Sequence, residues 1–359
     1  MLDSTLILIE FIIVFGLMLF VHELGHFLMC RLFHVEVEEF GFGLPPRAIR
    51  LFTWQGTEFT LNWLPFGAFV RPKGENNPEI SGGLASASPW VRLGVLLGGP
   101  VSNLLMGVIL FTVMFLSAGR SDPSIVMLQD IAPDSPAAAA NLKAGDIILK
   151  INDQPITSIE GFRTIIRSNA NIPVTITYQR GNAASATITL TPALSSEGTG
   201  QAGVYLGTGL RPVGFLEAVP LAFQTAYDQC RELFMVPGRL IAGTINPEEA
   251  RMVGVVGIFD IYSQVNKMDA EAAAAPAPRP QVFRLSFIAA ISIALGLTNL
   301  FPIPALDGGR ILFVLPEVLF RKRIPARFEN LANSVSFIGL LILMVLITIN
   351  DIANPIVLP

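Results

Sequence analysis

A His-Glu-x-x-His pattern at residues 22–26 holds two of the chain's 3 histidines. On a helix, His22 and His26 are four residues apart, so both imidazoles lie on one face and can bind a single metal ion. Glu23 follows directly, where its carboxylate can accept a proton from a metal-bound water. These residue types at this spacing predict a zinc site that hydrolyses peptide bonds. His34 lies beyond the apolar stretch around the pattern, and we interpret it as a surface residue.

The setting of this pattern is a run of apolar residues, 11–21, which predicts a membrane span. A lone histidine on an apolar face is usually a buried structural residue. Ionisable side chains inside a span are energetically expensive, however, and usually serve a function. The setting therefore predicts peptide hydrolysis within the bilayer.

The composition also indicates an integral membrane protein. Only 14% of the 359 residues are charged, whereas soluble proteins carry about 25%. The net charge of -4, without a basic cluster among aromatics, gives no case for a nucleic-acid partner. Cys30 and Cys230 lack metal-ligand spacing, and the orientation below puts them on opposite sides of the membrane, so we expect no disulfide. The first apolar run follows no basic segment or cleavage site, and we interpret it as a retained span.

Crossing a hydrocarbon core takes roughly 20 helical residues. Four segments qualify: Leu6–Leu28, Val91–Leu116, Phe287–Leu306 and Val335–Ile352. The third is interrupted by Asn299, Pro302 and Pro304 and is followed by Asp307. A broken helix in lipid must have its freed backbone groups satisfied by protein or water, so such a break tends to line a site.

Basic residues set the predicted orientation, because short cytoplasmic loops are rich in Lys and Arg. The loop after the first span carries Arg31, Arg47, Arg50, Arg71 and Lys73, with Arg92 at its edge. The loop after the third span carries Arg321, Lys322, Arg323 and Arg327. Both loops should be cytoplasmic, which leaves both termini and the long segment 117–285 outside.

The first loop is expected to form a small sheet from three strands, at residues 35–42, 47–54 and 58–63. Its many aromatic and aliphatic residues indicate a sheet that lies against or dips into the membrane. An ordinary soluble hairpin is the alternative.

A second domain is predicted at residues 123–210. Its stretch 131–153 has a Ser-Pro-Ala helix start and a Gly-Asp-x-Ile turn, and it resembles the circularly permuted PDZ domains of bacterial proteases. A helix at 161–168 and strands at 174–179 and 185–191 would follow. Such domains bind peptides by adding a strand to a sheet edge. Engagement of a peptide or substrate ectodomain and a spacer that only filters access both stay open.

The rest of the chain completes the predicted organisation. Residues 215–242 predict an amphipathic helix at the membrane surface, interrupted at Pro220 and Pro237. The Ala- and Pro-rich stretch 271–280 predicts a flexible linker. The expected fold class is thus a membrane α-helical protein of four transmembrane helices with an inserted extracytoplasmic α+β PDZ domain and a membrane-associated β-sheet loop. Its parts are residues 1–118, 119–211, 212–284 and 285–359.

Catalytic zinc usually has three protein ligands and one open position, so a third ligand must come from elsewhere. Asp307 is the best candidate, because the charge pattern puts it at the same cytoplasmic depth as His22 and His26. Gly308 and Gly309 beside it permit close backbone approach. The alternative for Asp307 is a helix cap near the interface.

Four stretches together resemble the site-2 protease family of intramembrane zinc metalloproteases over nearly the whole chain. They are the pattern at 22–26, Leu-Pro-Phe-Gly-Ala-Phe-Val at 64–70, Gly-Pro-Val-Ser-Asn at 99–103 and the run 299–309. One inserted PDZ domain resembles the bacterial regulator-of-sigma-E protease branch. Several members of that branch have two such domains, and Phe-Gly-Ala-Phe stands here where Gly-Gly-Tyr is common.

The resemblance implies that His22, His26 and Asp307 bind Zn²⁺ and that Glu23 is the general base. It also makes Asn299 a candidate to hydrogen-bond the substrate backbone or the oxyanion, with helix–helix hydrogen bonding as the alternative. Asn103 has the same two interpretations, with packing favoured.

The implied function is a zinc endopeptidase that cuts a transmembrane segment of single-pass membrane proteins, such as anti-sigma factors, in regulated intramembrane proteolysis. We expect it in a bacterial inner membrane, with the PDZ domain outside and the active site near the cytoplasmic side. A membrane binding protein without turnover is a rival that the intact Glu23 argues against. A metal transporter would require an internal repeat of spans, and the sequence contains none.

Overall fold

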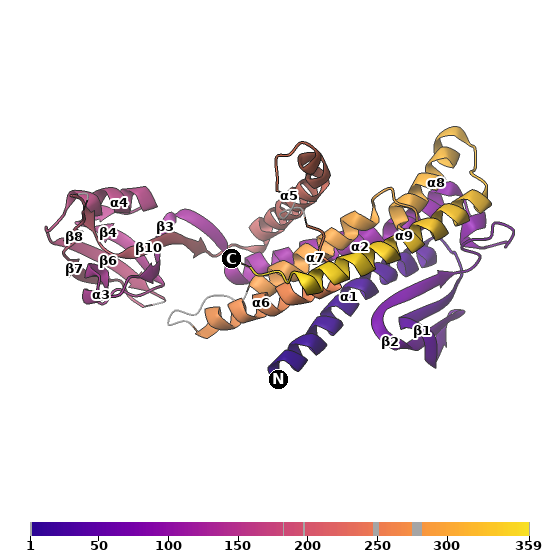
Figure 1. The fold of residues 1–359 in the computed structure, drawn as a ribbon, viewed down its shortest axis with the longest axis horizontal. Helices are drawn as coiled ribbons and strands as arrows, with labels where there is room; N and C mark the ends of the chain where they lie inside the picture. The colour runs from indigo at the N-terminus through magenta and orange to yellow at the C-terminus, as the bar shows by residue number, and fades with distance from the viewer. Residues whose placement is uncertain (1, 182, 197, 247–250, 275–281, 359) are drawn as a thin grey trace. The chain divides into compact units, whose positions relative to one another are not determined.

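The structure, a computed structural model, describes residues 2–181, 183–196, 198–246, 251–274 and 282–358 (Figure 1). The chain divides into two compact units. The first, which we call the membrane unit, comprises residues 1–112, 219–268 and 283–359. The second, the inserted unit, comprises residues 113–218 and 269–282.

The membrane unit is mainly helical. Its elements are α1 (Leu2–Leu32), β1 (Val37–Trp54), β2 (Thr57–Pro72), the 3-10 helix η1 (Leu84–Ser86), α2 (Pro89–Ala118), α5 (Phe215–Ile241), α6 (Val255–Ala274), α7 (Phe283–Asn299), α8 (Asp307–Phe320) and α9 (Ala326–Ala353). Among the described residues, α1, α2 and α9 are long and apolar enough to cross a membrane. This agrees with an integral membrane protein.

The predicted third span does not have the extent that we expected. In place of a span at Phe287–Leu306, the apolar helix α7 ends at Asn299 and is too short to count with α1, α2 and α9. Pro302 and Pro304 explain the end, because each lacks a backbone N–H and its ring clashes with the preceding turn. The chain then turns over residues 300–306 before α8 begins at Asp307.

Glycines allow the helices around α2 to approach closely. A Cβ atom added at Gly25 of α1 would lie 2.2 Å from the carbonyl oxygen of Gly98 in α2, and one added at Gly98 would lie 2.6 Å from that of Gly25. On α7, a Cβ atom at Gly296 would lie 2.8 Å from the Pro100 carbonyl oxygen. Small residues at such crossings are typical of membrane helices, where close backbone packing replaces the hydrophobic effect.

Two helical segments differ from the prediction. Pro220 and Pro237 lie inside α5 and do not interrupt it, because a proline removes one hydrogen bond without having to end a helix whose other bonds remain. Helix α6 was not predicted. Its last residues, 271–274, overlap the predicted linker, whose remaining residues 275–280 lie outside the described part of the chain.

The loop between α1 and α2 forms a sheet of two long strands rather than three short ones. The predicted strands 35–42 and 47–54 are parts of β1, and 58–63 is part of β2. Both strands bend, so that Phe40 pairs with Phe59 on one side and with Val70 on the other, while Phe52 also pairs with Phe59. The last part of β2 is therefore an edge of this sheet.

The sheet buries one set of apolar side chains and exposes another. Phe40 packs beside Phe27 of α1, with ring centroids 5.4 Å apart. Many large apolar side chains remain exposed: Leu44, Ile49, Leu51, Phe52, Trp54, Leu61, Trp63 and Leu64. An exposed apolar surface of this kind favours the prediction of membrane association over a soluble hairpin.

The inserted unit is an antiparallel sheet with two helices. Its elements are β3 (Arg120–Ile131), α3 (Pro136–Ala139), β4 (Asp146–Ile151), β5 (Gln154–Pro155), α4 (Ile159–Ser168), β6 (Val174–Arg180), β7 (Ala186–Leu190), β8 (Ala193–Leu194), β9 (Gly200–Gln201) and β10 (Val204–Arg211). The main strand order is β10-β3-β4-β6-β7, which makes β10 an edge. The predicted helix at 161–168 corresponds to α4, and the predicted strands at 174–179 and 185–191 correspond to β6 and β7.

Candidate metal centre

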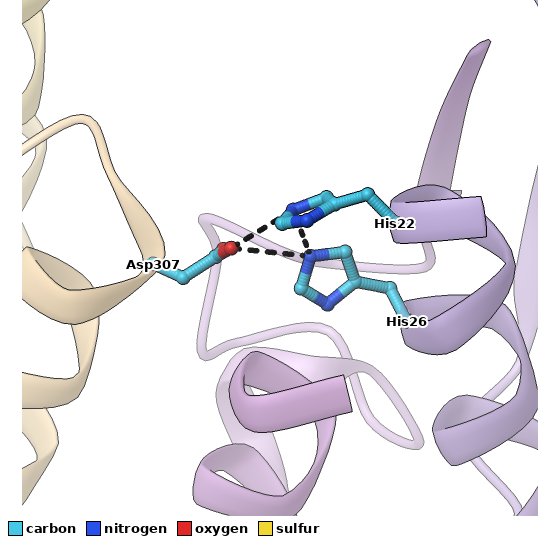
Figure 2. A group of neighbouring side chains, drawn as sticks. All are labelled: His22, His26 and Asp307. Carbon is cyan, nitrogen blue, oxygen red and sulfur yellow. Dashed lines mark hydrogen bonds and ion pairs between the residues drawn. The ribbon is translucent and has the colours of Figure 1, made fainter. Parts of the chain in front are cut away.

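Helices α1 and α8 bring three potential metal ligands together. The Nε2 atoms of His22 and His26 are 3.2 Å apart. Asp307 Oδ2 lies 3.1 Å from the first and 3.3 Å from the second. Figure 2 shows the carboxylate pointing at both imidazoles from the opposite element. His34, by contrast, is exposed.

This triangle has the dimensions of one face of a tetrahedral zinc site. Zinc bonds to histidine nitrogen and carboxylate oxygen are about 2.0–2.2 Å long, which puts the ligand atoms of a tetrahedron about 3.3 Å apart. Two neutral imidazoles and one carboxylate are also a usual donor set for catalytic zinc, and they leave one position open. The residues present therefore fit a zinc ion.

The other ring nitrogens determine which nitrogen can bind a metal. His26 Nδ1 donates a hydrogen bond to the carbonyl oxygen of Val95 in α2, at 2.8 Å, so its Nε2 keeps a free lone pair. His22 Nδ1 lies 3.4 Å from the side-chain amide of Asn103. Asn103 is fully buried, and its Oδ1 atom has no hydrogen-bond partner among the described residues. A half-turn of this amide puts Oδ1 opposite His22 Nδ1–H and orients His22 in the same way.

Gly99 of α2 lets this helix pass directly over the two imidazoles. A Cβ atom there would lie 2.4 Å from His26 Nε2 and 2.6 Å from His22 Nε2. Any side chain at this position would occupy the space between the ligands.

A cavity of about 270 Å³ opens beside the three potential ligands. Its wall includes Glu23 and Asn299. Glu23 Oε2 accepts a hydrogen bond of 3.0 Å from the backbone N–H of Val70, on the edge part of β2. The Asn299 amide nitrogen donates to the Leu295 carbonyl oxygen at 3.0 Å. The cavity thus contains the predicted base and one of the two predicted asparagines, while Asn103 lies behind His22 and does not line it.

Sequence reasoning missed Glu75 and Arg310, which also line the cavity. Arg310 lies one turn after Asp307 on α8 and donates hydrogen bonds to the Glu75 carboxylate and, at 3.0 Å, to Asn76 Oδ1. This pair connects the loop after β2 to α8. The signal in the sequence that could have identified Arg310 was its position, three residues after a candidate ligand in an otherwise apolar stretch.

A membrane protein with this donor set and an adjacent carboxylate belongs to the class of zinc metalloproteases. The chain is a member of peptidase family M50, the site-2 protease family, whose profile matches residues 10–344. It is 32% identical over 346 residues to a protein of Clostridium perfringens that is provisionally named a zinc metalloprotease, covering 96% of this chain and 98% of that protein. It is 27% identical over 374 residues to metalloprotease MmpA of Caulobacter vibrioides, covering 92% and 91%.

Two solved PDZ domains are also similar to part of the chain. One, from an SdrC-like protein of Listeria monocytogenes, is 25% identical and covers 24% of this chain and 92% of that domain, with a TM-score of 0.22. The other, from an SdrC-like protein of Listeria innocua, is 33% identical and covers 23% and 92%, with a TM-score of 0.20.

We predict that Asn103→Leu weakens zinc binding by about 10- to 100-fold, the usual range for loss of a residue that orients a metal-binding histidine. Without the amide, Nδ1 of His22 loses the partner that keeps the proton on it, while the Asp307 carboxylate, 3.1 Å from Nε2, favours the tautomer protonated at Nε2. The dissociation constant of zinc is measured on the detergent-purified protein by competition with a chromophoric chelator. The control is Thr112→Val, on the same helix, whose hydroxyl donates a hydrogen bond to the Val108 carbonyl oxygen of that helix. An unchanged constant in Asn103→Leu would show that Asn103 only fills space.

Proposed function

We propose that this zinc metalloprotease cuts within a transmembrane segment of single-pass membrane proteins, and that anti-sigma factors held at the membrane are representative substrates in regulated intramembrane proteolysis. The observation that supports this most directly is the position of the ligands. His22, His26 and Glu23 lie on α1, a helix long and apolar enough to span a bilayer. A site at this depth suits a peptide bond that is itself embedded in the membrane.

In this proposal, His22, His26 and Asp307 hold the zinc ion. Bound zinc lowers the pKa of water at the open position and polarises a substrate carbonyl group. Glu23 is the general base. The Val70 N–H holds one oxygen of its carboxylate, which leaves the other to accept a proton from the attacking water and pass it to the leaving amine.

Substrate presentation follows from the edge of β2. A transmembrane helix hides its peptide bonds in its own hydrogen bonds, so a segment of it must unwind before attack. Phe69, Val70 and Pro72 of β2 line the cavity. An extended substrate segment would pair with this edge as an added strand, and Asn299 would hydrogen-bond the substrate backbone with the oxygen of its amide.

For orientation, we propose a bacterial inner membrane with the metal site near the cytoplasmic face and the inserted unit outside. The short loop between α8 and α9 supports this proposal. Its charges Arg321, Lys322 and Arg323 are exposed, and short basic loops face the cytoplasm.

We propose further that the inserted unit is a PDZ domain that engages a peptide. A cavity of about 410 Å³ lies between α4 and the edge strand β10. Its floor includes the apolar side chains of Phe162 and Ile166, and its rim carries Arg163 and Arg167. An extended chain added to β10 would place a terminal carboxylate or an acidic side chain near these cations.

Glu23→Gln should slow cleavage by about 10²- to 10⁴-fold while zinc affinity stays within a factor of about two, because glutamine keeps the shape but cannot accept the proton. The expected slowing is the usual contribution of general-base catalysis. Cleavage of a single-pass reporter in proteoliposomes measures this, with Glu79→Gln, an exposed carboxylate, as the control. Cleavage by Glu23→Gln at the normal rate would refute the mechanism, and a binding protein without turnover would show no cleavage in any variant.

The orientation predicts opposite labelling of two engineered cysteines. In a protein whose Cys30 and Cys230 are replaced by serine, Ser196→Cys should react with a membrane-impermeant maleimide in spheroplasts. Lys322→Cys should react only after the membrane is permeabilised. Both native positions are exposed. The reverse pattern would invert the proposed orientation.

Charge reversal tests the groove of the inserted unit. Arg167→Glu should weaken binding of a fluorescent peptide with a free acidic C-terminus about tenfold or more, because a charge-assisted hydrogen bond contributes about 1.5–3 kcal/mol. Fluorescence anisotropy on the full chain measures this, with Lys150→Glu, exposed on β4, as the control. The alternative role, a filter that limits substrate access, predicts a different result. In that case the peptide does not bind, and substrates with bulky ectodomains are not cleaved.

A further inference from the structure

Residue Ala305, two positions before Asp307, has a backbone conformation that side chains rarely adopt. Its φ angle is +77°. This left-handed region crowds Cβ against the backbone, and only glycine enters it freely. A strained alanine beside a metal ligand persists only if neighbouring groups hold it in place.

The hydrogen bonds of the turn 300–306 show which group holds it. Pro302 and Pro304 have no N–H to donate. Four of the remaining N–H groups donate to backbone carbonyls of α7 or of the turn itself: those of Leu300, Phe301, Ile303 and Leu306. The N–H of Ala305 instead donates to a side chain from another helix, Asn333 Oδ1 of α9, at 3.2 Å.

Asn333 is a polar residue near the start of the apolar part of α9. In the most apolar 18-residue stretch of α9, none of the residues is buried, as expected for a helix that faces lipid. A polar side chain in such a helix usually faces protein or a water-filled cavity. Asn333 lines a cavity of about 350 Å³ together with Ala305, Asp307 and Arg310. Its amide therefore faces the element that carries the third ligand.

The turn transmits this restraint to Asp307. The first residues of α8 pack on the carbonyl groups of the turn, since a Cβ atom at Gly308 would lie 2.2 Å from the Leu300 carbonyl oxygen. One at Gly309 would lie 2.2 Å from that of Ile303. The turn and the start of α8 thus move as one piece. If Ala305 relaxed to a negative φ, the chain direction into Asp307 would change and its carboxylate would leave the two imidazoles.

We propose that Asn333 is a positioning residue for the metal centre: it holds Ala305 in its left-handed conformation and thereby directs Asp307 at His22 and His26. The inference rests on the proposed role of Asp307 as a zinc ligand. It assigns to α9 a part in forming the site, although no ligand comes from that helix.

Zinc affinity and cleavage kinetics test the proposal on the detergent-purified full chain. Asn333→Ala should weaken zinc binding about tenfold, within the range for residues that orient ligands. At saturating zinc it should lower kcat with little change in KM, because substrate contacts are intact. Asn333→Asp, which keeps an acceptor oxygen, should stay within about threefold of the parent. Asn330→Ala, an exposed asparagine one turn earlier on α9, is the matched control and should change nothing.

A second substitution separates positioning from general stability. Glycine at residue 305 adopts a positive φ without strain, so Ala305→Gly combined with Asn333→Ala should recover zinc affinity to within about threefold of the parent. Normal zinc affinity in Asn333→Ala, or no recovery in the double variant, would overturn the proposal. Asp307→Asn separates failure of the ligand assignment from failure of the role of Asn333. If Asp307→Asn keeps normal zinc affinity, the proposed ligand set is wrong. If Asp307→Asn loses zinc affinity while Asn333→Ala keeps it, only the role of Asn333 is refuted.

Discussion

The close contact between α1 and α2 at their glycines is the constraint on which the metal centre depends. Gly25 and Gly98 bring the two backbones so near that a Cβ atom on either would overlap a carbonyl oxygen of the other. At this separation the Val95 carbonyl oxygen lies 2.8 Å from His26 Nδ1. The next residue, Gly99, must then also lack a side chain, because the imidazoles occupy the space that a Cβ atom would need. The ligand geometry is therefore a result of helix packing, and the two cannot vary independently.

The proposed third ligand, Asp307, comes from a part of the chain where helical structure stops. If the helix continued through residues 300–306, each of these residues would move Asp307 about 1.5 Å further along the helix axis. The helical period would then set the direction of the Asp307 side chain. The prolines end α7, residues 300–306 form a turn, and a new helix starts at Asp307 itself. The carboxylate is thus set by a turn with few alternatives, packed on Gly308 and Gly309. The structure does not place Asp307 as the helix cap that was the alternative, because the N-cap of α8 is Leu306 and makes no side-chain capping hydrogen bond.

How much of this could be read from the sequence depends on whether a residue acts through its type and spacing or through its neighbours in space. The spacing of His22 and His26 on a helix requires a shared face, and apolar runs revealed α1, α2 and α9. The pairing of Asp307 with them could only be inferred from depth. The extents of β1 and β2 were missed because both strands bend, so that short apparent strands are parts of long ones. Helix α6 has no long apolar run, and Arg310 gains its neighbour Glu75 only through the folded loop.

Two asparagines show why the surroundings of a ligand are harder to predict than the ligand. An amide buried in an apolar helix is unfavourable unless it is paired, which applies to Asn103, whereas Asn333 is partly buried. Asn103 lies against His22 Nδ1 and is buried behind it. Asn333 accepts from the one backbone N–H of the turn that bonds to a side chain. Neither residue lines the cavity in which cleavage is proposed to occur. Neither is a proposed zinc ligand or the proposed base. In the roles proposed here, both orient a ligand, Asn103 the imidazole of His22 and Asn333 the carboxylate of Asp307. The direction of each of these two proposed ligands therefore depends on an amide that comes from a different helix, α2 for His22 and α9 for Asp307.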